Sequence, residues 1–182
     1  MKSMTAEEAR SFCTQESTSL AVDEHDSLYY DSPEEYSFFV KHPPGYRGVL
    51  ALTHDILTLG PPGLFEGGLV WLKAIWAGTD VFLRPGWRIL EDMRRAHGDL
   101  RTLDIAPAQH FRHDEFVELH VFLIQIMAYG WPACYVPGRS GFFLQFRSSE
   151  RFFCYSKDAA VTDDFSSKLA RWNPAREEAE TT

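Results

Sequence analysis

The chain has 182 residues, of which 45% are hydrophobic and 14% aromatic, and it carries a formal net charge of −8. This length and composition predict a single packed domain and exclude a largely disordered chain. No apolar run approaches the roughly 18 residues that a membrane helix needs, and the N-terminus lacks the apolar segment of a secretion signal. We therefore expect a soluble, cytoplasmic protein without membrane contact.

Cysteine spacing and charge distribution exclude two further classes. The three cysteines, Cys13, Cys134 and Cys154, show no CxxC spacing, so we expect free thiols rather than a disulfide framework or a structural zinc site. Residues 1–35 contain 9 acidic and 2 basic residues, whereas residues 36–157 contain 11 and 13. A body this close to neutral lacks the basic surface of a general nucleic-acid binder, so no nucleic-acid partner is expected.

The N-terminal segment, residues 1–35, predicts a capped helix followed by an acidic arm. Thr5 and Glu8 stand three residues apart in the sequence TAEE, which is typical of a capping box at the start of a helix. Residues 15–33 are polar and acidic, which indicates a loop or a loosely packed arm. The packed domain is therefore expected to begin at residue 36.

Residues 36–173 alternate between strand-like and helix-like patterns. Strand formers dominate 36–41, 68–76 and three short runs between residues 130 and 155. Apolar residues recur at helical spacing in 49–57, 85–96, 113–129 and 161–172. This order predicts an α+β domain with a mixed, mainly antiparallel sheet of about four or five strands and helices packed on it. Residues 174–182 are expected to form a disordered tail.

The last predicted strands hold more aromatic side chains than one face of a sheet can bury. Alternation along a strand places them on both faces. Either helices cover both faces, or one face is an exposed binding surface. The residues concerned are Phe142, Phe143, Phe146, Phe152 and Phe153.

Several segments resemble a group of small bacterial proteins to which no activity is assigned. These segments are Trp71–Trp76, Leu103–Pro107 and Trp131–Pro137, followed by an aromatic strand and Ser148–Arg151. Members of the group have a Gly-Trp-Asp-Ala-like turn and a Ser-His-Asp-Glu-like tetrapeptide. This chain has Pro132 at the position of the aspartate and Ser-Ser-Glu-Arg in place of the tetrapeptide. The resemblance spans about residues 36–172 and implies an α+β fold without implying an activity.

Imidazoles and carboxylates gather in one stretch, at His110, His113, Asp114, Glu115, Glu118 and His120. Such side chains are the materials of a metal site or an acid–base pair. The spacing does not match HExxH, however, and two helical turns, roughly 10 Å, would separate His113 from His120. We therefore predict no bound metal and no cofactor.

Three residues are candidates for catalysis: His113, His120 and Cys134. A Cys134–His120 pair could act as nucleophile and base in a small hydrolase. The position of His120 on the apolar side of its helix, between Phe116 and Leu123, instead favours a hydrogen-bonded core residue. The sequence contains no GxGxxG, P-loop or GxSxG motif.

The acidic arm offers a different kind of site. Asp23, Glu24 and Asp26 precede Tyr29 and Tyr30, a combination that could form a docking strip for a basic protein surface. The alternative is that the arm only keeps the chain solvated. Small size, acidity and the missing catalytic motifs favour a non-enzymatic protein-binding module, such as an immunity-type inhibitor or an adaptor. The alternative function is a small hydrolase that uses the His110–His120 region.

Overall fold

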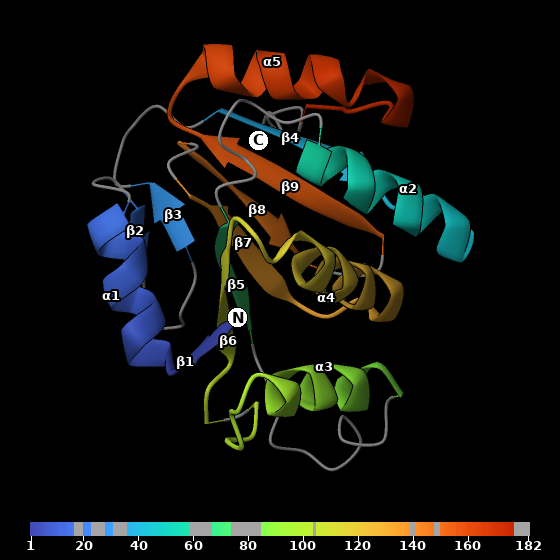
Figure 1. Ribbon diagram of the computed structural model, residues 1–182. Helices are drawn as coiled ribbons and strands as arrows, with labels where there is room; N and C mark the ends of the chain where they lie inside the picture. The colour runs from blue at the N-terminus through green and yellow to red at the C-terminus, as the bar shows by residue number, and fades with distance from the viewer. Residues whose placement is uncertain are drawn as a thin grey trace.

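The computed structural model describes residues 1–16, 20–22, 28–30, 36–58, 67–73, 85–103, 105–138, 141–147 and 150–176. Within these residues, seven strands form one sheet in which every neighbouring pair is antiparallel (Figure 1). In spatial order the strands are β1 (Lys2–Met4), β6 (Ala108–Arg112), β5 (Gly67–Leu72), β7 (Ala133–Pro137), β8 (Phe142–Phe146), β9 (Arg151–Ser156) and β4 (Tyr36–Lys41). A separate two-stranded sheet pairs β2 (Leu20–Val22) with β3 (Leu28–Tyr30). The chain is therefore an α+β protein.

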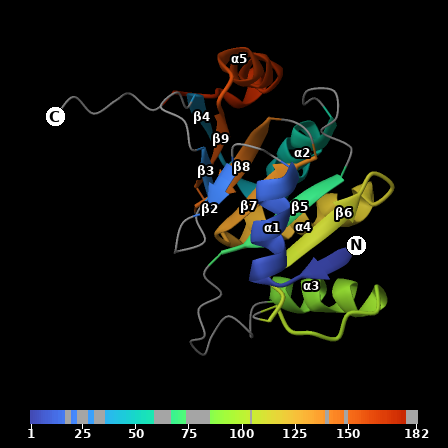
Figure 2. The ribbon, with the colours of Figure 1, turned by 90° about the vertical axis from the view of Figure 1, so that its left-hand side faces the viewer.

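The two faces of the main sheet are covered differently. One face carries α2 (Gly45–Thr58), α3 (Pro85–Ala96), α4 (Phe116–Tyr129) and α5 (Ala159–Lys168), followed by the 3-10 helix η2 (Ala170–Trp172). The opposite face carries α1 (Ala6–Glu16) together with β2 and β3, as the views in Figures 1 and 2 show. The main sheet is thus the middle layer of three.

The central strand β5 is apolar along its length because both of its faces are buried. No residue of its sequence GGLVWL is exposed, which confirms a central strand buried on both faces. The strand was predicted over residues 68–76; it spans 67–72, and residues 74–76 lie outside the described residues. Gly67 has a φ of +92°, and a Cβ at this position would lie 2.0 Å from the backbone oxygen of Phe111 on β6. Glycine is therefore required for β5 and β6 to approach this closely.

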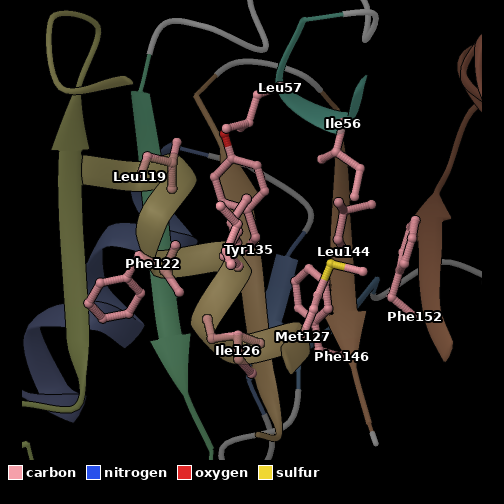
Figure 3. Close-up of a cluster of buried hydrophobic side chains, with 14 of the residues drawn as sticks. Ile56, Leu57, Leu119, Phe122, Ile126, Met127, Tyr135, Leu144, Phe146 and Phe152 are labelled. Carbon is pink, nitrogen blue, oxygen red and sulfur yellow. The ribbon is translucent and has the colours of Figure 1, made fainter. Parts of the chain in front are cut away.

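The larger core cluster lies between the sheet and helices α2 and α4 (Figure 3). The Phe122 ring of α4 packs on that of Phe111 on β6, with ring centroids 5.5 Å apart. Leu119 of α4 belongs to the same cluster as Tyr135, Leu144 and Phe152 of the sheet, and each of these side chains is no more than 1% exposed. Burying an apolar side chain of this size contributes about 1.5–3 kcal/mol relative to leaving it in water. This contact fixes α4 on the sheet, and α2 packs beside it.

The opposite face of the sheet has its own aromatic cluster beneath α1 and the β2–β3 pair. Phe143 stacks on Tyr155, and the guanidinium of Arg147 lies 4.5 Å above the ring of Phe153. The same guanidinium donates to the Tyr155 hydroxyl at 2.6 Å. The phenylalanines of β8 and β9 are each no more than 4% exposed. Both faces are therefore covered, and the surplus of aromatic residues forms core rather than an exposed patch.

The sheet is larger than the prediction of about four or five strands. That prediction missed β1 and β6, because neither shows an apolar strand pattern: β1 carries Lys2 and Ser3, and β6 carries Gln109 and His110. Ser3 and Gln109 are paired in register, and the Ser3 hydroxyl donates to the Gln109 side-chain oxygen at 2.8 Å. Since residues 108–112 are a strand, α4 begins at Phe116 and not at the predicted position 113.

The boundaries of the packed domain also differ from those predicted. β1 belongs to the main sheet, and α1 buries Ala9 and Cys13 against it, so residues 1–16 are part of the domain. At the other end, Ala175 and Phe39 exchange two backbone hydrogen bonds of 2.8 and 2.9 Å. The tail predicted for residues 174–182 is therefore packed on β4 at its start, and residues 177–182 lie outside the described residues.

Candidate functional site

His120 on α4 is held against α2. Its Nε2 lies 2.9 Å from Thr53 Oγ1 and 3.3 Å from the carbonyl oxygen of Leu50. The Thr53 hydroxyl donates to the Val49 carbonyl at 2.9 Å, which leaves its oxygen to accept a hydrogen bond from the histidine. Neutral His120 therefore carries its proton on Nε2. His120 is thus hydrogen-bonded as predicted, but it is only partly buried and lies between α2 and α4 at the margin of the core rather than within it.

A second imidazole lies beside His120. The ring centroids of His54 and His120 are 5.8 Å apart, and Phe116 contacts both rings. Partial burial lowers the pKa of His120 and outweighs the hydrogen bond to Leu50, which acts in the opposite direction; His54 lowers the pKa further. The fold therefore favours the neutral form of His120.

The outer surface of α2 and α4 exposes large apolar side chains. On α2, Tyr46 and Leu50 are 59% and 42% exposed, and together with His54 they form a stripe at four-residue spacing. On α4, Val117 is 68% exposed. We define the α2–α4 face by these residues and their neighbours: Tyr46, Leu50, His54, Phe116, Val117 and His120. Exposed apolar side chains that gather in this way mark interaction surfaces more often than isolated ones do.

The other two catalytic candidates lie elsewhere. His113 is exposed in the turn between β6 and α4. Cys134 is fully buried on β7, in the cluster under α1, on the face of the sheet opposite α4. The sheet separates its thiol from the imidazole of His120, so these two residues form no nucleophile–base pair. In the same cluster, burial raises the pKa of the Cys13 thiol to about 12, far above that of a reactive cysteine.

The acidic docking strip lies only partly within the described residues. Asp23, Glu24 and Asp26 are outside them. Tyr29 and Tyr30 belong to β3, and Tyr29 is 43% exposed. The β2–β3 pair lies with α1 on the side of the sheet away from α2 and α4 (Figure 2). The strip and the α2–α4 face are therefore two separate candidate surfaces.

A pocket opens at the edge of the main sheet, where β1 pairs with β6. Its volume is about 380 Å³, and the lining residues are Met1, Lys2, His97, His110, Arg112 and Glu115. We call it the sheet-edge pocket. His110 and Glu115 belong to the run of imidazoles and carboxylates that the sequence indicated as a candidate site. Lys2, His97 and Arg112 were missed, because only the pairing of β1 with β6 and the packing of α3 bring them to the same place.

Glu115 is a fixed part of the pocket wall. It is 5% exposed, and its Oε2 accepts a hydrogen bond from the Arg112 backbone N–H at 2.9 Å. Its Oε1 pairs with the α-ammonium of Met1 and lies 3.6 Å from the Arg112 guanidinium. Both carboxylate oxygens therefore have partners within the protein, and Glu115 ties β1 and β6 to the start of α4.

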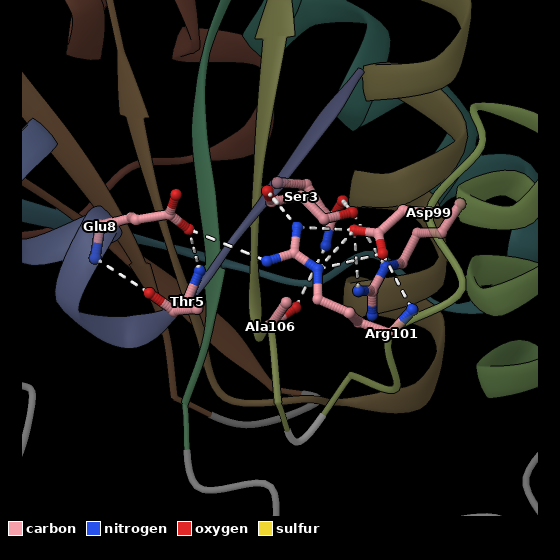
Figure 4. Close-up of polar contacts among 8 residues, drawn as sticks. Ser3, Thr5, Glu8, Asp99, Arg101 and Ala106 are labelled. Carbon is pink, nitrogen blue, oxygen red and sulfur yellow. Dashed lines mark hydrogen bonds and ion pairs between the residues drawn. The ribbon is translucent and has the colours of Figure 1, made fainter.

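A polar network joins β1 to the C-terminal end of α3 (Figure 4). Arg94 is only 1% exposed; its Nε donates to the Ser3 hydroxyl at 3.1 Å and its Nη2 to Asp99 at 3.5 Å. Arg101 donates to the Asp99 carboxylate at 2.9 Å and to the Ser3 carbonyl at 2.9 Å. The network forms hydrogen bonds to both the backbone and the side chain of Ser3. It therefore holds β1 in place, and β1 forms one wall of the sheet-edge pocket.

The predicted capping box is confirmed and extends this network. The Thr5 backbone N–H donates to Glu8 Oε2 at 2.7 Å, and the Glu8 backbone N–H donates to Thr5 Oγ1 at 3.2 Å. The Glu8 carboxylate also lies 4.0 Å from Arg101 (Figure 4). The start of α1 is therefore held both by its own cap and by the residues that hold β1.

Within the residues that the structure describes, no three His, Cys, Asp or Glu side chains are grouped so as to hold a metal ion. In the same part of the chain, no helix is both long and apolar enough to cross a membrane. Comparisons of the chain with protein-family models, curated proteins and solved structures give no match. The role of each site therefore follows from its own chemistry.

Proposed function

We propose that this chain is a non-enzymatic protein-binding module and that the α2–α4 face is its contact surface. The observation that carries the proposal is the exposure of Tyr46, Leu50 and Val117, at 59%, 42% and 68%, on two helices packed side by side. Removing such side chains from water favours association by about 25 cal/mol per Å² of apolar area, and the loss of translational and rotational freedom opposes it. Tyrosine is also among the residues that most often anchor protein interfaces.

The α2–α4 face is held in a fixed arrangement. Leu52 and Ile56 on the inner side of α2 and Leu123 on α4 are completely buried in the core. The hydrogen bond between His120 and Thr53 joins the two helices near the surface. A partner would therefore dock on a preformed surface, which reduces the entropic cost of binding.

Charge indicates that the partner is a different, basic protein rather than a second copy of this chain. Two copies, each with a net charge of −8, repel one another, whereas a basic surface is attracted. None of the six residues that define the face is an Asp, Glu, Lys or Arg, so the face itself contributes little to this charge. The apolar side chains would supply contact area, and the charge of the whole chain would accelerate association.

Charge-introducing variants test the proposal. Leu50→Asp and Val117→Asp place a carboxylate on the α2–α4 face, while Leu100→Asp, at a position that is 82% exposed and outside the face, makes the same chemical change. Each variant would be used for affinity capture from an extract of the organism that encodes the chain. A protein retained by the wild type and by Leu100→Asp, but not by the two face variants, would then be purified.

The binding of this purified partner would be measured by biolayer interferometry. We expect Leu50→Asp and Val117→Asp to weaken binding by at least about tenfold, and Leu100→Asp to have little effect. Retention of the same proteins by all variants would contradict the proposal. A wild-type dimer in light scattering that Leu50→Asp dissociates would also contradict it, since the face would then serve self-association.

The hydrolase alternative receives less support. It requires a cleft that combines His113, His120 and a carboxylate. The sheet-edge pocket contains His110 and Glu115 instead. His113 and His120 are not among its lining residues, and the oxygens of Glu115 are engaged by Met1 and Arg112.

A further inference from the structure

We propose that the sheet-edge pocket binds a small molecule through a phosphate monoester group. Side chains that can donate N–H hydrogen bonds reach this pocket from three segments: Lys2 on β1, His97 after α3, and His110 and Arg112 on β6. The net charge of the chain is −8, so a cluster of basic side chains is not expected from the overall composition. The inference does not depend on the protein-binding proposal, because it concerns a different part of the molecule.

The register of the sheet explains why the donors converge. Lys2 pairs directly with His110, so their side chains project from the same face of neighbouring strands with Cβ atoms roughly 5 Å apart. Arg112 follows His110 by two residues and therefore lies on that face as well. An ammonium, an imidazole and a guanidinium thus occupy adjacent positions on the face that carries α1. His97 follows α3 on the opposite face and lines the same pocket at the edge formed by β1.

The size of the pocket favours a small organic ligand over a bare ion. A volume of about 380 Å³ lies within the range of roughly 300–1,000 Å³ that is typical of small-molecule sites. The His110 ring also contacts Phe12 of α1, with ring centroids 5.1 Å apart, so one side of the donor cluster is backed by an aromatic side chain. The phosphate group would meet the donors, and the organic part would occupy the remaining volume.

A phosphate monoester suits this donor set better than a carboxylate does. At neutral pH it carries a charge between about −1.5 and −2 and has three terminal acceptor oxygens, whereas a carboxylate has one charge and two oxygens. Several donors from different directions can therefore be satisfied at once.

The acidic residues near the pocket do not prevent this. Glu115 has partners on both oxygens, as described above. Asp114 lies 3.2 Å from the Arg112 guanidinium and is 55% exposed, so solvent screens its charge. The guanidinium of Arg112 has five N–H groups, which is more than these two carboxylates require.

Binding would be tested on the full chain without an N-terminal tag, because the ammonium of Met1 pairs with Glu115. Isothermal titration calorimetry in a low-salt, phosphate-free buffer would compare phenyl phosphate, inorganic phosphate and benzoate. We expect saturable binding of phenyl phosphate that is at least about tenfold tighter than that of benzoate. The NMR signals of the histidine ring protons should shift for His97 and His110 and stay unchanged for His113.

Exposed positions supply variants that retain the fold and matched controls. Lys2→Met and His97→Gln remove donors from the pocket, and Lys41→Met and His113→Gln make the same changes outside it. Each pocket variant should weaken phenyl phosphate binding by about tenfold or more, and each control by less than about twofold. The proposal fails if phenyl phosphate shows no saturable binding, if benzoate binds equally well, or if pocket and control variants behave alike.

Discussion

Trp172 of η2 donates its indole N–H to the carboxylate of Asp55 on α2 at a distance of 2.7 Å. Asp55 is only 4% exposed, and its carboxylate also pairs with the guanidinium of Arg171. The two residues are 117 positions apart in the sequence. A buried acid therefore fastens the C-terminal end of the domain to the helix that carries one half of the α2–α4 face.

This contact predicts that Trp172→Phe destabilises the protein more than the loss of the neighbouring ion pair does. Phenylalanine retains most of the packing but leaves a buried charged acceptor without its N–H donor, which should cost about 1.5–3 kcal/mol in the free energy of unfolding. Arg171→Met is the comparison: Arg171 is 58% exposed, so solvent screens its charge, and the loss of its ion pair should cost less than the loss of the Trp172 hydrogen bond. Urea unfolding measures both, and equal losses would contradict the prediction.

His120 should make the fold sensitive to mild acid. Its pKa is lowered in the folded protein, chiefly by burial, so the unfolded chain binds the proton more readily. The free energy of unfolding is therefore unaffected by this residue above the unfolded pKa of about 6.5, and it decreases as the pH drops below that value; we call this decrease the acid limb. His120→Leu should flatten this limb between about pH 4 and 6.5. The exposed His113 provides the control, since His113→Gln should leave the limb unchanged; an unaltered limb in His120→Leu would exclude this role.

Asp99 should make the free energy of unfolding depend on pH in a second, more acidic range. Hydrogen bonds from the Arg101 side chain hold the pKa of this carboxyl well below its usual range, with a smaller contribution from Ser3, although partial burial opposes them. A depressed pKa contributes stability that is present above the unfolded value of about 4 and is lost as the pH falls further. Asp99→Asn should therefore lower stability at neutral pH and reduce its decline below about pH 4. Asp92→Asn, at an exposed position on α3, should change neither, and thermal unfolding across this pH range compares the two.

Much of the fold could be predicted because its helices and central strands carry strong apolar patterns. The helix at residues 85–96 is found where its periodicity placed it, and β5 shows the continuous apolar run of a strand buried on both faces. β1 and β6 could not be found in this way, since their polar side chains are satisfied across the sheet. Ser3 and Gln109, for example, bond to one another across 106 positions of sequence.

The candidate sites were predicted less well, because contacts between distant parts of the sequence also decide which side chains lie together. A run of histidines and carboxylates in the sequence suggested one site from His110 to His120, but a strand, a turn and a helix divide that run. His110 faces the sheet-edge pocket, whereas His120 faces α2. Lys2 and His97 join His110 only through long-range pairing and packing, which local spacing does not reveal.

The C-terminal end of the domain offers a test of the predicted tail. Truncation after Asn173 removes the two backbone hydrogen bonds between Ala175 and Phe39 and the ion pair between Arg176 and Asp163. It also uncovers the edge of β4, which can then pair with other chains. We expect a loss of about 1–3 kcal/mol from two hydrogen bonds. Truncation after Arg176 should stay within about 0.5 kcal/mol of the full chain, and equal stability of both truncations would show that the Ala175 bridge contributes nothing.

The acidic strip of residues 23–30 leads to a separate prediction about the partner. If Asp23, Glu24 and Asp26 steer a basic protein towards Tyr29 and Tyr30, reversing the three charges should slow association without changing the melting temperature. The wild-type association rate should fall between roughly 50 and 500 mM salt, because the Debye length shrinks to a few ångströms. The triple variant should have lost most of this salt dependence.

Surface plasmon resonance with the captured partner would separate the strip from the α2–α4 face. Charge steering acts mainly on the association rate, whereas loss of apolar contacts acts mainly on the dissociation rate. The triple charge variant should therefore change the former, and Leu50→Asp chiefly the latter. Tyr29→Ser removes an exposed aromatic ring from β3 without touching α2 or α4, so faster dissociation in this variant would place contact area on the strip itself. Unaltered kinetics in both strip variants across the salt series would reduce the acidic segment to a feature that keeps the chain in solution.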